Sequence, residues 1–410
     1  MKLSLDQLRL VLCLGVNCTI GYGTLFYSFS LLALEIEQSL GWSSHFIYGV
    51  YSLGLFVGGF FAPYLGKLLD RYGTRCSMAL GSLLMACCLY GLSTVESKSA
   101  FVIYLLVLEV FSILVLYESA FVAIVKAYDS GSQPRANDNQ RQSMTQITLM
   151  AGFASTIFWP LIAFLLTIVE WRDVYFYMAL IHLLVCFPLH LYGLNPRYKI
   201  DDQPDKPDSS VISMKSKPKV QRKQEWLLAL SLAGIAFCIN GVQIHFFSIT
   251  EGLNVEHVVA VLAGTLVGPF QVVSRLVDLL FSRRISPFFL GFISVGLITL
   301  GLLLLWLTSF LSQSAVLLFA IFFGMGQGLM YIVRGALPLY LFGSSAYGAV
   351  TGRLNGVRIS MTAAAPLLIS LLISNIAVEY VVIILIFLSL CCYGSLVILS
   401  KQSRLDSPLQ

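Results

Sequence analysis

Eight stretches of this sequence contain no Asp, Glu, Lys or Arg, and each is long enough to cross a lipid bilayer as a helix. A membrane helix needs about 20 residues, and a charge at mid-bilayer costs at least about 2.5 kcal/mol. The stretches therefore predict membrane-spanning helices. They cover residues 10–34, 38–66, 76–95, 142–169, 174–196, 226–250, 359–378 and 380–400.

Four further helices bring the predicted total to twelve. The charge-free stretch 285–333 is long enough for two helices with a turn at Ser309 to Ser314, and the apolar stretches 100–126 and 257–280 carry internal charges. Only 11% of the 410 residues are charged, whereas soluble domains carry about 25%. The chain is therefore predicted to be an all-α integral membrane protein.

The basic residues indicate how the chain is oriented. Of 26 Lys and Arg residues, only Lys98 and Arg172 fall in loops that alternate to the outside. Lys and Arg accumulate on the cytoplasmic side of membrane proteins. We therefore predict a multi-pass protein of the cell inner (plasma) membrane, in contact with the lipid bilayer, with cytoplasmic N- and C-termini.

A polar segment divides the chain into two halves. Residues 195–224 hold eight basic residues, four Asp and four Pro, the composition of a flexible cytoplasmic linker. The sequence thus predicts six-helix bundles at 1–194 and 225–400, and a cytoplasmic tail at 401–410. A short internal match at an offset of 208 relates Gly66 to Arg75 with Ser274 to Arg283, which favours two pseudo-symmetric bundles.

The loop after the second predicted helix carries the most specific motif, Gly66-Lys67-Leu68-Leu69-Asp70-Arg71-Tyr72-Gly73-Thr74-Arg75. Gly66 is expected to let helices approach closely and Gly73 to permit a tight turn. Asp70 is expected to pair with Arg71, Arg75 or a helix N-terminus.

The same loop resembles the G-x-L-x-D-R-x-G-R-R/K signature of the major facilitator superfamily, with Thr74 replacing the first of the two final basic residues. Gly66, Asp70, Arg71, Gly73 and Arg75 match it. The resemblance implies a transporter with two six-helix bundles, in which this loop has a conformational role.

The resemblance also implies that the first and fourth helices of each half line a central cavity. Asn17 lies on a polar stripe with Gly21, Thr24 and Ser28, which faces either the cavity or a packing surface. In the fourth helix, Glu109 and Glu118 stand on opposite sides, so they cannot share one site. Intramembrane carboxylates are candidates for proton or cation binding, or they pair with a neighbouring helix.

The tenth predicted helix carries Gln327, Tyr331 and Arg334 on one face. At an offset of 216, Arg334 corresponds to Glu118. We hypothesise that Glu118 and Arg334 face each other across the inner cavity, as a gate or a proton-linked anion site. The alternative is an arginine that extends to the inner membrane surface.

The seventh predicted helix carries Asn240 and Gln243 on one face and His245 near its outer end. His245 is a candidate for proton coupling, with an ordinary helix-to-helix hydrogen bond as the alternative. Two other helices carry long stripes of small and polar residues, and the second stripe is a candidate pore wall. They are Gly264, Gly268, Gln271, Arg275 and Asp278 in helix eight, and Thr145, Thr148, Gly152, Ser155 and Trp159 in helix five.

These features favour a secondary active transporter of a small organic solute, working by alternating access, with proton coupling through Glu109, Glu118 or His245. Arginines in the inner half of the membrane favour an anionic solute; they are Arg275, Arg334, Arg353 and Arg358. No G-x-x-x-x-G-K-S/T loop occurs, so an ion or solute gradient is expected to supply the energy. The solute and the direction of transport stay open.

Three alternatives remain. A transporter-like sensor would bind a solute without moving it, and an exporter of drugs or siderophores would share the fold, although Ala151 to Pro160 only partly matches the glycine-rich antiporter pattern. A membrane enzyme fits poorly because the five histidines are scattered. We expect no enzymatic activity, no cofactor, no metal site and no nucleic-acid partner, and we expect a monomer.

Overall fold

The computed structural model describes residues 5–127, 134–194, 219–281, 286–342 and 347–405. These ranges form helices joined by short turns, and twelve of their helical segments are long and apolar enough to span a membrane. The prediction of an all-α chain with twelve membrane helices is confirmed.

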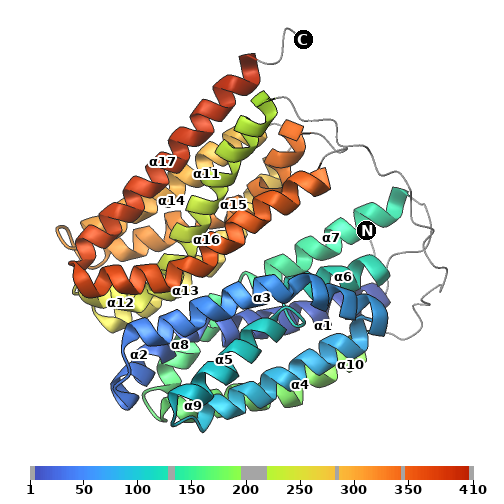
Figure 1. Cartoon of the computed structure of the whole chain (residues 1–410), viewed down its shortest axis with the longest axis vertical. Coiled ribbons are helices and arrows are strands. Elements are labelled where there is room, and N and C mark those ends of the chain that lie inside the picture. Colours follow the sequence, from blue (N-terminus) through green and yellow to red (C-terminus); the bar gives the residue numbers. More distant parts are fainter. Residues whose placement is uncertain (1–4, 128–133, 195–218, 282–285, 343–346, 406–410) are drawn as a thin grey trace.

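The first six spans form the N-terminal bundle (Figure 1). Four of these spans change helix type or break on the way across the membrane. Span one is α1 (Leu5–Gly21), the π-helical turn η1 (Tyr22–Tyr27) and α2 (Phe29–Leu40); spans two and three are α3 (Ser44–Tyr72) and α4 (Thr74–Ser93); span four is α5 (Lys98–Ser112) and α6 (Tyr117–Ala127); span five is α7 (Pro134–Ala151) and α8 (Ala154–Leu165); span six is α9 (Trp171–Ile181), the π-helical turn η2 (His182–Cys186) and α10 (Phe187–Gly193).

The last six spans form the C-terminal bundle, which lies beside the first in Figure 1. Span seven is α11 (Lys219–Ile244) and α12 (Phe246–Gly252), followed by α13 (His257–Phe281), α14 (Pro287–Leu307), α15 (Ala315–Phe342), α16 (Tyr347–Asn375) and α17 (Val378–Leu405). Because α14 ends at Leu307 and α15 begins at Ala315, the turn predicted at Ser309 to Ser314 is confirmed.

Two predicted boundaries move in the structure. Helix α11 begins at Lys219, inside the predicted linker 195–224, and α17 continues to Leu405, inside the predicted tail 401–410. A helix makes its backbone hydrogen bonds in water as well as in lipid. Both helices therefore continue past their apolar stretch into segments that contain basic residues. Residues 195–218 and 406–410 lie outside the described ranges.

Serine caps and one left-handed glycine define several short turns between spans. The hydroxyls of Ser43, Ser97 and Ser286 each accept the backbone N–H three residues later, at the start of α3, α5 and α14. Gly41 ends α2 with φ 62°, a conformation that suits glycine.

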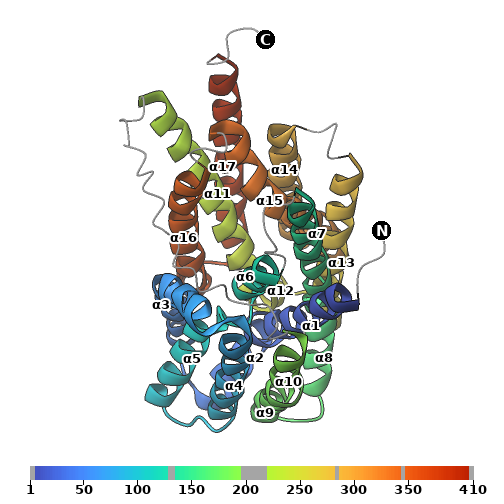
Figure 2. The ribbon, with the colours of Figure 1, turned by 90° about the vertical axis from the view of Figure 1, so that its right-hand side faces the viewer.

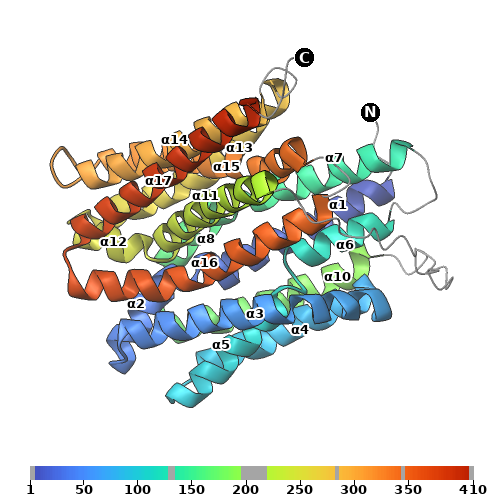
Figure 3. The ribbon, with the colours of Figure 1, turned by 45° about the horizontal axis from the view of Figure 1, so that its top comes forward.

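The two bundles meet along pairs of helices, one from each bundle. Helix α16 runs beside α3, and α13 runs beside α8, as Figures 2 and 3 show. Smaller contacts join α2 to α11 and α12. We call the membrane face where α1 begins and α17 ends the terminal face, and the face where α2 ends the far face.

Candidate functional site

The interface between α8 and α13 is made of backbone and small side chains. A Cβ atom on Gly268 would lie 2.7 Å from the carbonyl oxygen of Gly152, so the two helices touch directly. Near the terminal face, Arg275 Nη1 donates to the carbonyl of Thr148 at 2.9 Å. The stripes predicted in helices five and eight therefore face each other, and a role of the helix-five stripe as a pore wall stays a prediction.

A proline opens a hydrogen-bonding position at this interface. Pro269 lies inside α13 and has no N–H, so the carbonyl of Thr265, four residues earlier, loses its usual donor. The hydroxyl of Thr156 in α8 donates to that carbonyl at 3.0 Å. The N-terminal bundle thus supplies the bond that the proline removes.

A second proline also leaves a backbone carbonyl for a neighbouring helix to bond, where α11 and α3 pack against α16. Pro366 leaves the carbonyl of Thr362 without its helical donor, and Asn240 Nδ2 donates to it at 2.8 Å. The carbonyl of Pro366 itself accepts a hydrogen bond from His245 Nε2 at 2.8 Å. Ser52 Oγ of α3 accepts a hydrogen bond from the backbone N–H of Leu367 at 2.9 Å.

Two predicted residues, Asn240 and His245, therefore join α11 to α16. His245 is 1% exposed, and its ring centroid lies 3.9 Å from that of Tyr48 in α3. This geometry fits the helix-to-helix hydrogen bond that was the alternative for His245. Its role in proton coupling stays a prediction.

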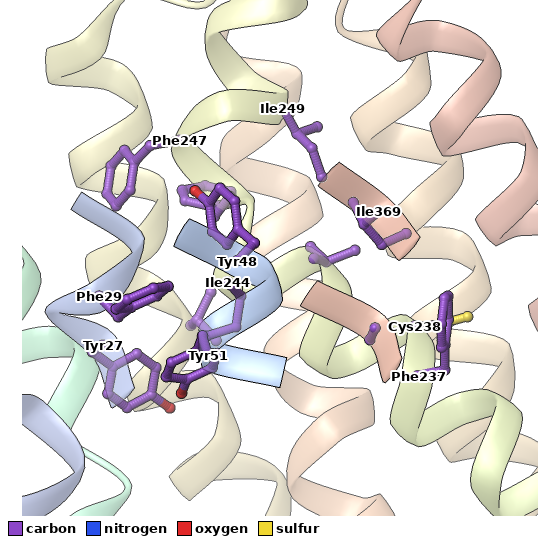
Figure 4. Packing of buried hydrophobic residues seen from close by; sticks show 14 of the residues in the cluster. Tyr27, Phe29, Tyr48, Tyr51, Phe237, Cys238, Ile244, Phe247, Ile249 and Ile369 are labelled. Carbon is purple, nitrogen blue, oxygen red and sulfur yellow. The ribbon is translucent and has the colours of Figure 1, made fainter. Parts of the chain in front are cut away.

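Aromatic rings fill the far side of the interface between the bundles. Trp159 of α8 donates from Nε1 to the carbonyl of Tyr27 and to Ser30 Oγ, both at 2.9 Å. Its ring stacks on Phe246 at 5.4 Å, and Phe247 lies edge-on at 5.5 Å. Figure 4 shows Tyr27, Phe29, Tyr48, Tyr51 and Phe247 gathered in this region.

Three glutamines meet beneath this aromatic region. Gln327 Oε1 of α15 accepts from Gln271 Nε2 of α13 at 3.0 Å and from Gln243 Nε2 of α11 at 3.3 Å. Gln243 Nε2 also lies 3.5 Å from the hydroxyl of Tyr27. We call these four residues the amide group. The predicted candidates Gln243 and Gln327 are thus in direct contact.

Nearer the terminal face, arginines surround Tyr331 of α15. The guanidinium carbons of Arg275 and Arg334 lie 4.9 and 4.8 Å from its ring centroid, a cation–π distance. Tyr331 is 41% exposed, although it lies within a membrane span. Arg334 therefore turns along the helix toward this ring.

Residues from the other bundle approach the same place. Tyr22 of η1 and Glu118 of α6 are close enough to Arg358 of α16 to interact electrostatically with it. Tyr22 also interacts with Glu118 and Tyr331, and its ring centroid lies 4.6 Å from that of Tyr117. We call this set the seam cluster: Tyr22, Tyr117, Glu118, Arg275, Tyr331, Arg334 and Arg358.

The hypothesised pair of Glu118 and Arg334 shares this cluster without a direct ion pair among the described residues. Both side chains act on Arg358. Glu118 is exposed at the surface of the protein. The pair remains a proposal, now with Arg358 as the residue that connects them.

One predicted arginine lies outside the cluster. Arg353 forms an ion pair with Glu225 at the start of α11. It thus joins two spans of the C-terminal bundle, and the seam cluster contains the other three arginines noted in the sequence.

Glu109 lies away from the seam cluster, inside the N-terminal bundle. It is 6% exposed and packs against Gly54 of α3, where a Cβ would lie 2.8 Å from its Cγ. Its Oε1 atom has no hydrogen-bond partner among the described residues. The two carboxyl groups of span four therefore lie in different surroundings, as their spacing predicts.

The predicted stripe of span one is split by η1. Asn17 donates to the carbonyl of Cys13 at 2.9 Å and is buried at 2% exposure. Within the turn, Thr24 contacts His182 of η2 at 2.7 Å, inside the same bundle. The stripe therefore faces packing surfaces of the N-terminal bundle, because the π turn rotates one end of the helix against the other.

The loop motif is partly described. Gly73 has φ 78° between α3 and α4, which confirms its turn, and Arg75 Nε donates to the carbonyl of Leu191 at 3.0 Å. Arg71 lies over the ring of Tyr72. A Cβ on Gly66 would meet nothing within 4 Å among the described atoms, so close helix approach at Gly66 is wrong here. The side chain of Asp70 lies outside the described part.

Sequence reasoning missed Tyr22, Tyr27 and Tyr117. A continuous helix would not place Tyr22 and Tyr27 on one side, and the π turn that does so has no simple sequence signature. No group of three His, Cys, Asp or Glu that could hold a metal occurs among the described residues.

Known proteins share this architecture. The family model of the Major Facilitator Superfamily matches residues 12–366. A bacterial homolog of the human lysosomal transporter Spinster, inward-facing and unoccupied, is 13% identical with a TM-score of 0.62, covering 98% of this chain and 96% of that chain. The nucleoside transporter NupG is 12% identical with a TM-score of 0.69, covering 96% and 99%. No curated protein matches.

These two structures carry the same fold at low identity. The match to the family model covers most of the sequence and both bundles. The chain therefore belongs to the major facilitator superfamily of membrane transporters.

Proposed function

We propose that this protein is a secondary active transporter that moves a small organic anion together with a proton, by alternating access between its two bundles. The observation that carries the proposal is the seam cluster. It brings three arginines, three tyrosines and one glutamate from both bundles to one place in the membrane.

The arginines support an anionic solute. Guanidinium groups bind carboxylates and phosphates through two parallel hydrogen bonds, and burying an unpaired charge inside a membrane is costly. The cluster as defined contains three arginines and one carboxylate, Glu118, so it can accept additional negative charge. The tyrosine rings suit an apolar or planar part of the same solute.

Glu118 supports proton coupling. An ionised Glu118 and an anionic solute would compete for Arg358 and Arg334. The solute therefore binds best when Glu118 carries a proton, and the two cross the membrane together. This is a symport mechanism, and the proton gradient drives the solute in the direction of proton entry.

The orientation of the basic residues supports the direction of opening. If the terminal face is cytoplasmic, the aromatic contacts around Trp159 close the outer side, and the seam cluster is reached from inside. The two bundles then rock about the α8–α13 and α3–α16 interfaces to exchange sides. A monomer of the inner membrane is sufficient for this cycle.

The test is counterflow in liposomes containing the purified protein, with a panel of labelled organic carboxylates and phosphates. A transporter exchanges a labelled solute for the same unlabelled solute, whereas a sensor binds it without exchange. For the solute that exchanges, Arg358→Gln is expected to raise KM at least about tenfold, because a charge-assisted hydrogen bond contributes about 1.5–3 kcal/mol.

Arg353→Gln is the matched control, since Arg353 is occupied by Glu225 outside the cluster. It should leave KM unchanged. The proposal fails if Arg358→Gln and Arg353→Gln have the same effect, or if an uncharged solute exchanges as well as its anionic analogue.

A further inference from the structure

The π turn η1 interrupts span one at the level of the site and carries two of its tyrosines. The N–H of Ser28 donates to the carbonyl of Gly23, five residues earlier, at 3.0 Å. Residues five apart on an α-helix point about 140° apart, whereas a turn closed by such bonds brings them to nearly the same side. Tyr22 and Tyr27 are five apart, and they reach Tyr331 and Gln243 of the other bundle.

Thr24 lies inside this turn and contacts His182 of span six. The hydroxyl of Thr24 donates its hydrogen to the carbonyl of Ile20 at 2.8 Å. A hydroxyl has one hydrogen, so toward His182 it can only accept. His182 therefore carries its hydrogen on Nε2 and donates it to Thr24 Oγ1 at 2.7 Å.

His182 begins a π turn of its own. In η2 the N–H of Phe187 donates to the carbonyl of His182, five residues earlier. The side chain of His182 is buried at 1% exposure, and its Nδ1 atom has no partner among the described residues. The Thr24 bond is thus the one side-chain hydrogen bond of this imidazole in the described structure, and it joins the two π turns.

We propose that His182 is a positioning residue for the transport site: its hydrogen bond to Thr24 keeps η1 in the π register that presents Tyr22 and Tyr27 to the C-terminal bundle. Without the bond, η1 relaxes toward the α-helical register, and the two tyrosines no longer share one side. The inference rests on the proposed function for the role of the tyrosines, whereas the register can be measured without a solute.

The test is thiol labelling of Tyr22→Cys in purified full-length protein, with a sulfonated methanethiosulfonate reagent. The exposed Cys76, Cys87 and Cys391 are first replaced by Ser, and the six buried cysteines are kept. Adding Thr24→Val, which removes the hydroxyl at nearly constant shape, is expected to slow labelling about fivefold, the factor of one buried hydrogen bond. Thr24→Ser should restore the original rate.

The structure provides a matched control, a second buried histidine of span six with a hydroxyl partner. His190 Nδ1 and Ser82 Oγ form a similar buried bond at 2.8 Å, away from η1. Ser82→Ala should therefore leave labelling of position 22 unchanged. Equal labelling with Thr24→Val and without it, or equal slowing by Ser82→Ala, would overturn the proposal.

If Thr24→Val does not fold, a second pair of variants tests the same hydrogen bond from the side of His182. His182→Gln keeps an N–H donor and should label at the original rate, whereas His182→Leu has no donor and should label slowly. The same rate for these two variants would contradict the role of the bond. For an exchanged solute, His182→Leu should raise KM and leave kcat unchanged, while failure of every solute to exchange would count against the proposed function alone.

Discussion

The hydroxyl of Thr156 in the N-terminal bundle donates a hydrogen bond of 3.0 Å to the carbonyl of Thr265 in the C-terminal bundle. Pro269 makes that carbonyl available, because it removes the backbone donor that would otherwise occupy it. The contact exists only while α8 lies against α13. It therefore stabilises the arrangement in which the two bundles are in contact through α8 and α13.

Replacing Thr156 with Val is expected to weaken closure of the far face. The lost bond corresponds to about 1 kcal/mol, or about a fivefold shift between closed and open states. Spin labels at Ser39, in the last turn of α2, and at Ile376, just after α16, are exposed on opposite bundles at the far face and would report the two populations by their distance. Thr299→Val is the control, because Thr299 bonds Ser389 within one bundle; an equal shift in both variants would refute the role of the interface.

Replacing Gly268 with Ala is expected to destabilise the protein by several kcal/mol, because the new Cβ would lie 2.7 Å from the carbonyl of Gly152 and neither backbone can yield. Gly394→Ala is the matched control, since a Cβ there meets nothing within 4 Å. Thermal unfolding in detergent compares the two. A Gly268→Ala protein as stable as Gly394→Ala would mean that the helices are not in direct contact.

Glu118→Gln is expected to separate solute movement from the proton gradient. The amide cannot release a proton, yet it no longer competes with an anion for Arg358. Counterflow should therefore persist, while acceleration of uptake by an imposed proton gradient should disappear. Glu109→Gln lies outside the seam cluster and serves as the comparison; if it alone abolished the acceleration, Glu109 would be the coupling residue.

His245→Gln is expected to leave the pH profile of transport unchanged. The bond to the carbonyl of Pro366 needs only an N–H donor, which a glutamine amide also supplies. Uptake by the variant and the parent would be measured across the same pH range. A flattened profile in His245→Gln would restore His245 as the proton carrier.

The sequence predicted the twelve spans well because bilayer thickness sets the length of a helix, and a charge inside it is costly. It located the residues of the site less well. The stripes of helices five and eight show which sides are polar, but a stripe cannot say whether it faces water or another stripe. The contact between Gly152 and Gly268 was for this reason not predicted.

The register of span one was beyond sequence reasoning for a different reason. An ideal 3.6-residue period places Asn17 and Thr24 on one stripe, and a single π turn is enough to separate them. Tyr22 and Tyr27, which lie in this turn, were missed with it. Arg353 shows the converse limit, since its partner Glu225 lies 128 residues away in the sequence.

The direct contact between α8 and α13 also matters while the chain is being made. The first six spans enter the bilayer before α13 has been synthesised, so lipid must temporarily cover the bare backbone at Gly152 and the hydroxyl of Thr156. A ribosome product that stops after residue 194 would carry this uncovered surface permanently. Residues 219–405, supplied as a separate polypeptide, contain the helix surface that this fragment lacks, and we expect the two pieces to assemble through it.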